Sequence, residues 1–379
     1  MRQPIPLLGL LAIAAFLVSG CHKADPGAAV PSGKQVQDAG VLNLFWWSDF
    51  LAPDTIPNFE KQTGIKVSIS YYDSEEILET RMLTGNSGFD VVVPAAPYFF
   101  QRQTRSGAYL ALDKNKLPNL ANLDPAIMAR VASVDPDNAH GIVYMWGTVG
   151  IGYNREKVAG ALPTVPLTSW RVVFDPATAS KLAKCGIQIL DSPAEVVLLV
   201  LRYLGKDANS RSPQDLADVE RVLVAIRPYI RNVDSTGYIQ AIANGDICVA
   251  VGYNGDFVQA RRRATEAKNG VQIAYALPEE GSVVYFNMLA VPRDAPHADN
   301  AHRFLNYLMK PEVIAEITNF VGYANANRGA TPLLDPSIAN DTASYPTLAQ
   351  RDRLFVQTES TPEQARAITR LWQKFKTGQ

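Results

Sequence analysis

The sequence predicts an α/β fold, in which helices flank mostly parallel sheets in two lobes. Strand and helix patterns alternate between residues 41 and 93, and a second set of such elements begins at residue 187. Between the two sets, residues 144–154 are apolar but interrupted by glycines, which favours an extended connection between lobes over a helix. Alternation of strands and helices is typical of parallel sheets that are covered by helices.

The first set of elements is recognised from periodicity and from the residues that end each helix. Apolar runs indicate buried strands, apolar and polar residues in alternation indicate a half-buried strand, and Ser and Gly mark helix starts and stops. In order, we expect a buried strand at 41–46, a helix at 55–62 ended by Gly64, an alternating strand at 65–71, an amphipathic helix at 74–83 capped by Ser74 and stopped by Gly85, and a short buried strand at 90–93.

The second set follows the same logic. The elements expected are a strand at 187–190, helices at 193–203 and 214–226, a helix at 238–243 ended by Asn244-Gly245, strands at 247–251 and 283–291, and helices at 298–309 and 361–376. The length of the chain allows two domains. We assign 41–147 plus about 275–325 to lobe 1, and 148–274 plus about 326–379 to lobe 2.

The N-terminus carries an export signal. Arg2 is followed by an apolar run over residues 5–18 that is too short to span a bilayer comfortably. The segment Val18-Ser19-Gly20-Cys21 resembles a lipobox, which predicts a lipoprotein signal peptide at 1–20 and a lipid on Cys21. The alternative is an ordinary secretory signal. Residues 21–40 are rich in Ala, Pro, Gly, Gln and Lys, and we expect a flexible tether there.

Charge and cysteine usage narrow the function classes. Because Arg2 is the one charged residue of the removable segment, the remaining chain has 35 basic and 37 acidic residues, a net charge of −2, and nucleic-acid binding gains no support. With Cys21 assigned to the lipid, Cys185 and Cys248 are left as a pair in an oxidising compartment. We predict a disulfide between them, the alternative being two free thiols in the core.

Aromatic and acidic side chains recur where the predicted strands end. In parallel α/β sheets, ligands bind beyond the carboxyl ends of the strands. The segments that follow these strands are Trp46-Trp47-Ser48-Asp49-Phe50, Pro94-Ala95-Ala96-Pro97-Tyr98-Phe99-Phe100, Asp191-Ser192-Pro193-Ala194-Glu195 and Gly252-Tyr253-Asn254-Gly255-Asp256-Phe257, while Tyr285-Phe286-Asn287 lies within a strand. None of these segments contains a basic residue.

This composition suits a cationic ligand. An ammonium group that leaves water needs carboxylate partners, and aromatic rings add cation–π attraction and flat walls for an alkyl chain. Each acidic residue also has a structural interpretation: Asp49 and Asp256 could cap helices, and Glu195 could suit the dipole of a helix start. Trp46 and Trp47 are adjacent in a strand and face opposite sides, so we expect Trp46 in the core.

Taken together, several segments resemble the putrescine- and spermidine-binding proteins of bacterial polyamine importers, most closely the putrescine-binding branch. The resemblance extends over nearly the whole chain after the signal. The segments that carry it are Trp47-Ser48-Asp49-Phe50-Leu51-Ala52-Pro53-Asp54-Thr55, residues 58–67, Tyr144-Met145-Trp146, Gly150-Ile151-Gly152-Tyr153-Asn154, Tyr203-Leu204-Gly205-Lys206, residues 244–250 and Tyr323-Ala324-Asn325-Ala326-Asn327.

The resemblance implies a two-lobed periplasmic binding protein fold of type II, which closes on its ligand about a hinge between the lobes. It also supports the Cys185–Cys248 disulfide. The partners implied are a polyamine and the membrane subunits of an ABC permease, and the chain is expected to be monomeric and periplasmic, either anchored through Cys21 or soluble. The ligand-binding residues implied are Ser48, Asp49, Glu195 and Asp256 for the amines and Trp47, Tyr253, Tyr285 and Tyr323 for the alkyl chain.

Three positions depart from the pattern of this family. Asn287 stands where putrescine binders show an aspartate, Ala95 where they show a serine, and Tyr253 where they show a tryptophan. Asn287 cannot neutralise an ammonium but can donate to a carboxylate. We therefore include Asn287 in the site and expect either weaker putrescine binding or a related ligand, such as spermidine, agmatine, a mono-acylated amine or an ω-amino acid such as 4-aminobutyrate.

Other function classes receive less support. The histidines show no metal-ligand spacing, and the sequence contains neither a nucleophile elbow nor a phosphate-binding loop, so we expect no catalytic residue, cofactor or metal. Tyr71-Tyr72 could ligate ferric iron, although tyrosines at a strand end are more often packing residues. A sensor that presents the bound amine to a receptor is not separated from a transport protein by sequence.

Overall fold

The computed structural model describes residues 40–48 and 50–378. The predicted signal peptide, the predicted lipid-bearing Cys21, the predicted tether up to residue 39, and Asp49 lie outside the described residues. Within the part of the chain that the structure describes, no helix has the length and apolar character needed to cross a membrane.

Twelve strands of the described chain form one continuous hydrogen-bonded network. Its main path runs in the order β2-β1-β3-β10-β5-β8-β6-β7, while β9 and β11 pair with β5, and β4 and β12 pair with β10. The strands are β1 Val41–Trp47, β2 Lys66–Tyr72, β3 Val91–Val92, β4 Ala95–Ala96, β5 Gly141–Asn154, β6 Ile187–Ile189, β7 Ile230–Val233, β8 Val249–Tyr253, β9 Ile273–Ala276, β10 Ser282–Ala290, β11 Ala324–Asn325 and β12 Leu354–Phe355.

Helices flank these strands and connect most of them. The α-helices are α1 Thr55–Thr63, α2 Glu75–Thr84, α3 Tyr98–Arg105, α4 Pro125–Val131, α5 Arg155–Ala161, α6 Arg171–Phe174, α7 Pro176–Leu182, α8 Pro193–Tyr203, α9 Pro213–Ile226, α10 Gly237–Asn244, α11 Asn254–Glu266, α12 Ala298–Leu308, α13 Pro311–Val321, α14 Pro336–Ala339, α15 Leu348–Arg351 and α16 Pro362–Thr377. Short 3₁₀ segments occur at Lys114–Lys116, Pro118–Asn122, Pro136–Asn138, Arg227–Tyr229 and Arg328–Leu333.

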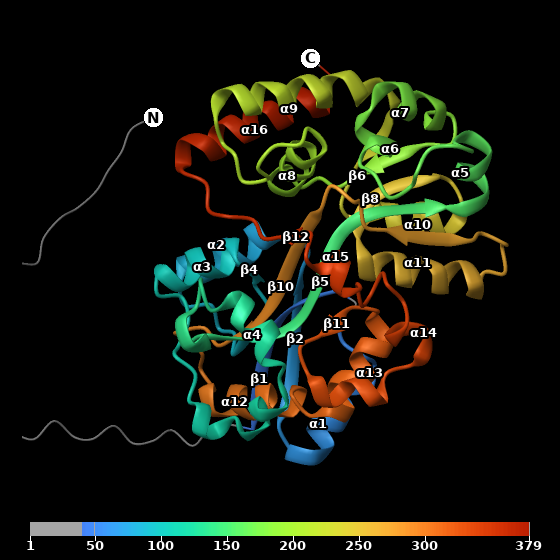
Figure 1. Cartoon of the computed structure of the whole chain (residues 1–379). Coiled ribbons are helices and arrows are strands. Elements are labelled where there is room, and N and C mark those ends of the chain that lie inside the picture. The colour runs from blue at the N-terminus through green and yellow to red at the C-terminus, as the bar shows by residue number, and fades with distance from the viewer. Residues whose placement is uncertain (1–39, 49, 379) are drawn as a thin grey trace, which may run out of the picture. The chain divides into compact units, whose positions relative to one another are not determined.

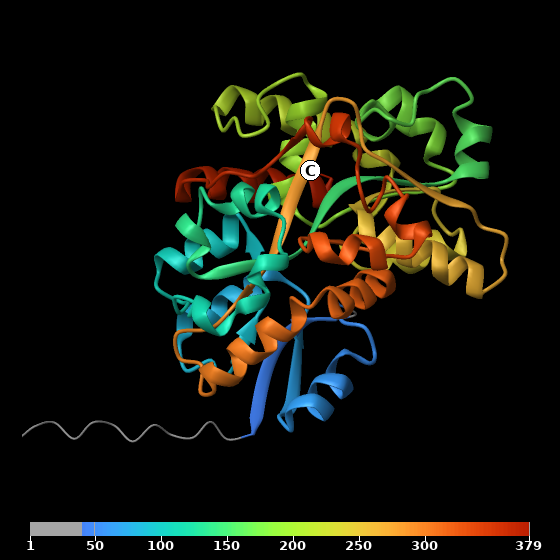
Figure 2. The same cartoon turned by 60° about the horizontal axis from the view of Figure 1, so that its bottom comes forward.

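Strands β5 and β10 connect the two halves of the network, and they run side by side (Figure 1, Figure 2). Residues Gly141–Thr148 of β5 pair with β10, and residues Val149–Tyr153 continue into pairing with β8. The predicted extended connection at 144–154 is therefore confirmed as part of a long strand. Strands β5 and β10 pair antiparallel with each other, whereas the pairs β1–β2 and β6–β7 are parallel. The predicted α/β class is therefore confirmed, with an antiparallel pair at the centre of the sheet.

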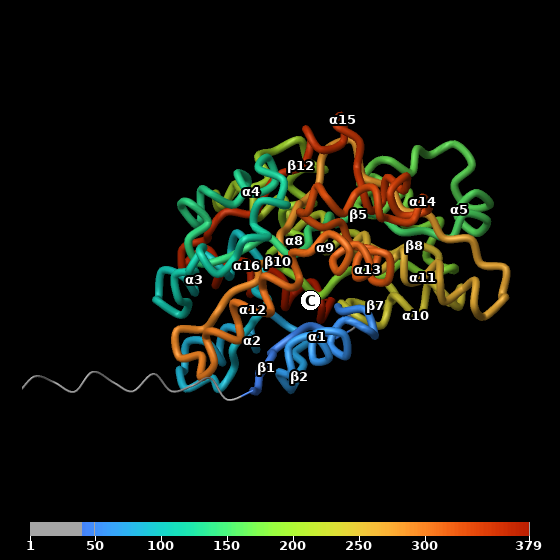
Figure 3. The backbone as a smooth tube through the Cα atoms, turned by 90° about the horizontal axis from the view of Figure 1, so that it is seen from below, coloured from blue at the N-terminus to red at the C-terminus, as the bar shows by residue number. Residues whose placement is uncertain are grey.

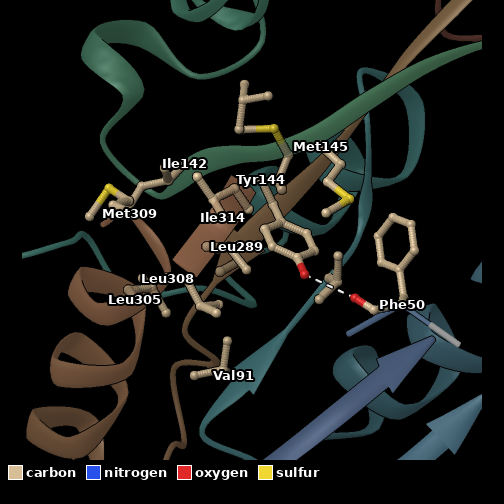
Figure 4. Packing of buried hydrophobic residues seen from close by; sticks show 14 of the residues in the cluster. Phe50, Val91, Ile142, Tyr144, Met145, Leu289, Leu305, Leu308, Met309 and Ile314 are labelled. Atoms are coloured by element: carbon tan, nitrogen blue, oxygen red, sulfur yellow. Dashed lines mark hydrogen bonds between the residues drawn. The ribbon is translucent and has the colours of Figure 1, made fainter. Parts of the chain in front are cut away.

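Each half of the network has its own hydrophobic core. The first core surrounds β1, β3 and the first part of β5, where Tyr144 packs among aliphatic side chains and donates to the Phe50 carbonyl at 2.9 Å (Figure 4). The second core surrounds β6 and β8 and is covered by α8 and by the C-terminal helix α16. Ala330 and Leu334 belong to the first core, and Ile368 and Trp372 of α16 to the second.

Local signals end the helices where the sequence indicates. The Ser74 hydroxyl accepts from the Ile77 amide at 3.3 Å and caps α2. Gly64 and Gly245 end α1 and α10 with φ values of 74° and 78°, a left-handed conformation that glycine adopts without steric cost.

Figure 3 shows β1 and β2 side by side, and their pairing joins Val41–Trp47 to Lys66–Tyr72 in parallel register.

The predicted disulfide between Cys185 and Cys248 is present in the structure. It joins the segment after α7 to the residue that precedes β8, and Cys248 is fully buried in the second core. The bond closes a loop between residues 63 positions apart in sequence. Because a cross-link removes conformations from the unfolded chain, it stabilises the folded state by about 4 kcal/mol in the chain-entropy treatment of a loop of this size.

Replacing both cysteines by serine should therefore lower the free energy of unfolding by about 4 kcal/mol. Urea unfolding followed by far-UV circular dichroism measures the change. Dithiothreitol should destabilise the native protein and have no further effect on the double variant. A loss under about 1 kcal/mol would contradict the stabilising role, since native disulfides typically contribute more than this.

Candidate ligand-binding site

Two acidic side chains of the second half lie at neighbouring helix starts. Glu195 is the third residue of α8, which follows β6, and Asp256 is the third residue of α11, which follows β8. Since β6 and β8 are paired in parallel, their carboxyl ends meet at the same edge of the sheet. The predicted Glu195 and Asp256 are thus brought to one place by the topology of the sheet.

The Asp256 carboxylate is held by two phenols and leaves little of its surface exposed. The Tyr323 hydroxyl donates to Asp256 Oδ1 at 2.7 Å, and the Tyr238 hydroxyl donates to Asp256 Oδ2. Burial raises the pKa of Asp256 to about 6, although both hydrogen bonds and the charge of Arg263 act to lower it. Both carboxylate oxygens accept hydrogen bonds from these phenols. Asp256 therefore does not act as the N-cap of α11.

Glu195 is positioned by a third phenol. The Tyr253 hydroxyl donates to Glu195 Oε2 at 2.8 Å. Burial raises the pKa of Glu195, the hydrogen bonds from Tyr253 and Ser192 oppose the rise, and the charge of Glu76 adds to it. Phenols satisfy the carboxylate oxygens but do not neutralise them, so both groups keep their affinity for a cation.

Aromatic side chains from both halves meet beside these carboxylates. The rings of Tyr253 and Tyr285 are in edge contact, with centroids 5.3 Å apart at an interplanar angle of 79°. Gly147 of β5 makes room for this arrangement, because a Cβ there would lie 2.3 Å from the Tyr285 hydroxyl and 2.5 Å from Asn254 Oδ1. The predicted Tyr253, Tyr285 and Tyr323 are therefore brought together with the predicted carboxylates.

Asn287 lies two residues beyond Tyr285 on the same strand, so the two side chains share a face of the sheet. It is 6% exposed and pairs across the ladder with Ala95 of β4. Its Oδ1 atom is buried and has no hydrogen-bond partner among the described residues. A buried acceptor of this kind is rare in folded proteins and calls for a partner.

The end of β1 contributes the remaining predicted residues. The Trp47 indole donates to the Val93 carbonyl at 3.1 Å and packs on Tyr72, with ring centroids 4.5 Å apart. Ser48 is exposed, and Asp49 lies outside the described residues. Trp46 is fully buried, which confirms that it is the core member of the tryptophan pair.

The tyrosine pair considered for iron does not converge on a common point. Tyr71 is 60% exposed, whereas Tyr72 is buried beneath Trp47 and donates to the Val93 carbonyl at 2.7 Å. Tyr72 is thus a packing residue.

Sequence reasoning missed two residues of this region. Tyr238 of α10 is fully buried; its hydroxyl holds Asp256 and accepts from the Tyr253 amide at 3.0 Å. Glu75 of α2 is also buried, and its Oε1 accepts from the Ala95 amide at 2.9 Å. Neither position carries a signal in sequence, because Tyr238 falls on an apolar helix and Glu75 follows a helix cap, where an acidic residue is ordinary.

The sequence and the fold correspond to a known class of proteins. Residues 55–347 match the family of bacterial extracellular solute-binding proteins. The chain therefore belongs to this family, and it is a binding protein and not an enzyme.

Individual relatives are more specific. The chain is 46% identical over 345 residues to the putrescine-binding periplasmic protein SpuD of Pseudomonas aeruginosa. The alignment covers 91% of this chain and 94% of that protein. The chain is 45% identical over 352 residues to the putrescine-binding periplasmic protein PotF of Escherichia coli, with 92% and 95% covered. A solved spermidine/putrescine ABC transporter substrate-binding protein, PotD of Streptococcus pneumoniae, superimposes with a TM-score of 0.76 at 26% identity and covers 89% of this chain and 99% of that one.

The raised pKa of Asp256 predicts how affinity for a cation such as putrescine depends on pH. When the pH is below the Asp256 pKa of about 6, a binding cation must first displace the proton from the carboxyl group. Affinity should be constant near pH 8 and fall as the pH drops through 6, by up to about tenfold per unit for this group. Calorimetric titrations between pH 8 and pH 5 measure the profile.

The variant Asp256→Asn tests the assignment of this pH effect. It should lose about 3 kcal/mol or more of binding free energy, because a buried ammonium loses its anionic partner, and its residual affinity should depend less on pH. Asp246→Asn, an exposed position in the turn before β8, serves as the matched control and should behave like the native protein. A native profile in Asp256→Asn would contradict the assignment.

Proposed function

We propose that this protein is the extracytoplasmic solute-binding component of an ABC importer for polyamines, with putrescine as its ligand. The observation that carries the proposal is a pair of carboxylates, the half-buried Glu195 and the buried Asp256, which are held by phenols with no cation among their hydrogen-bond partners. The identity of 45–46% with two putrescine-binding periplasmic proteins supports the same ligand.

In the proposed complex, Glu195 and Asp256 bind one ammonium group. The rings of Tyr253, Tyr285 and Tyr323 provide flat apolar surfaces beside the methylene chain. They also attract the ammonium groups at its ends through cation–π interactions. Trp47, Ser48, Asp49 and Asn287 are proposed to contact the ligand from the first half. Agmatine is a second candidate, because a relative 36% identical over 370 residues is a putrescine/agmatine-binding protein of Pseudomonas aeruginosa.

The two cores are proposed to act as lobes that close on the ligand. Strands β5 and β10 pass through both and would act as the hinge. Tyr323 packs in the first core and donates to Asp256 of α11, which packs in the second, so contacts across the site already couple the two. A ligand held from both sides selects the closed arrangement through those contacts, which a permease can then recognise.

Export to the periplasm and attachment to a membrane through a lipid on Cys21 complete the proposal. The periplasmic names of the relatives and the disulfide both support an exported protein. The lipid rests on the segment 18–21 alone.

Isothermal titration calorimetry on the exported and processed protein measures the affinity for each candidate ligand. Putrescine should bind with a Kd below about 1 μM, equivalent to about −8 kcal/mol. Spermidine, cadaverine, agmatine and 4-aminobutyrate should bind more weakly. Absence of putrescine binding would overturn the proposed ligand, and tighter binding of agmatine would favour the second candidate.

Fractionation tests the anchor. The native chain should sediment with membranes and incorporate labelled palmitate, whereas Cys21→Ala should do neither. Recovery of the native chain in the soluble periplasmic fraction without label would contradict lipidation and favour an ordinary secretory signal.

A further inference from the structure

Two buried oxygen atoms on the first-half side of the site have no hydrogen-bond partner among the described residues: Glu75 Oε2 and Asn287 Oδ1. Glu75 is 9% exposed and Asn287 is 6% exposed. Asn287 Oδ1 is a hydrogen-bond acceptor, and Glu75 Oε2 is an acceptor in the ionised carboxylate. Leaving such groups unpaired is costly, more so for a carboxylate than for an amide.

The two side chains are connected through one residue pair of the sheet. The other carboxylate oxygen of Glu75, Oε1, accepts from the Ala95 amide at 2.9 Å. Ala95 of β4 is in turn the residue directly opposite Asn287 of β10 in the antiparallel ladder. Glu75 therefore binds the backbone of β4 at the residue that pairs with Asn287.

Asn287 connects this residue pair to the site already described. Asn287 shares its face of β10 with Tyr285, whose ring contacts Tyr253. The charge of Glu195 is among the causes that raise the pKa of Glu75. Burial is the largest cause of that rise, and the charges of Glu76 and Glu79 add to it.

We propose that Glu75 supplies an anionic group at the second end of the ligand site, in addition to Asp49, and that it binds a protonated amine or a guanidinium together with the Asn287 amide oxygen. This inference rests on the proposed function and specifies its ligand class: a chain with a cationic group at both ends. One cation meets Glu195 and Asp256, and the other meets Glu75 and Asn287.

The assignment changes what Asn287 implies. An amide at position 287 by itself suggests an end that accepts a neutral or acidic group. A cation that binds beside Glu75 stabilises its ionised form against the raised pKa, so the carboxylate supplies negative charge from helix α2. This end then favours a cation over the carboxylate of an ω-amino acid.

The experiment compares Glu75→Gln with the native protein by calorimetry, using putrescine and 4-aminobutyrate as probes. Putrescine affinity should fall at least about tenfold, the equivalent of one charge-assisted hydrogen bond. Affinity for 4-aminobutyrate should rise, because the repulsion is removed and the new amide can donate to the ligand carboxylate. Opposite changes for the two probes are a result that structural damage does not produce.

Two further variants complete the test. Glu363→Gln removes the same charge from an exposed position in the first turn of another helix, α16, and should leave both affinities unchanged. The double variant Glu75→Gln/Asn287→Asp returns a carboxylate to the same place from β10 and should restore putrescine binding. The thermal unfolding temperature of ligand-free Glu75→Gln should not decrease, since an amide is less costly to bury than a carboxylate.

The outcomes separate this inference from the proposed function. Tight putrescine binding by the native protein and by Glu75→Gln alike would overturn the role of Glu75 and leave the proposed function intact. A parallel loss of both probes with a lower unfolding temperature would assign Glu75 a structural role and equally overturn the inference. Failure of the native protein to bind putrescine would overturn the proposed function itself.

Discussion

The antiparallel pairing of β5 with β10 is the constraint on which the site depends. Both strands contribute to the two cores, and the ladder sets which side chains of β10 face the site. Tyr285 and Asn287 lie on one face because they are two residues apart, and a slip of one residue in register would turn both away. Gly147 on β5 leaves the space that the Tyr285 hydroxyl occupies. Backbone pairing thus positions the aromatic wall before any ligand contact is made.

Electrostatics distinguish the site from the rest of the protein. Asp215 provides a contrast, because it is paired with a cation and the ammonium of Lys206 lowers its pKa to about 2. In the site, the partners of Asp256 are phenols, and burial raises its pKa to about 6. A phenol satisfies an oxygen atom without cancelling its charge, so the stabilisation that a salt bridge would provide is left for the ligand to supply. Glu75 follows the same pattern with a backbone amide as its single donor.

Sequence reasoning located elements whose signals are local. The strand β1, the helices α2 and α8 and the long extended segment in β5 lie within a few residues of their predicted positions, because periodicity, caps and glycines act over short distances. Helix α3 was not predicted: three aromatic residues in succession after a strand end resemble a loop that lines a site, and tertiary packing decides that they start a helix. The very short strands, such as β4, are defined only by their partners.

The sequence by itself determined the α/β class, the two sets of elements, the cysteine pair, and the recurrence of carboxylates and aromatics at strand ends. Each of these depends on residue type and on spacing along the chain. Only the tertiary structure decided which of those side chains meet and what environment each one has. It brought Tyr238 to Asp256 and the Glu75 carboxylate to the residue opposite Asn287, contacts between residues that are far apart in sequence. Burial and the distance to other charges are properties of the packed chain, and they decide which acidic residues remain without a cation.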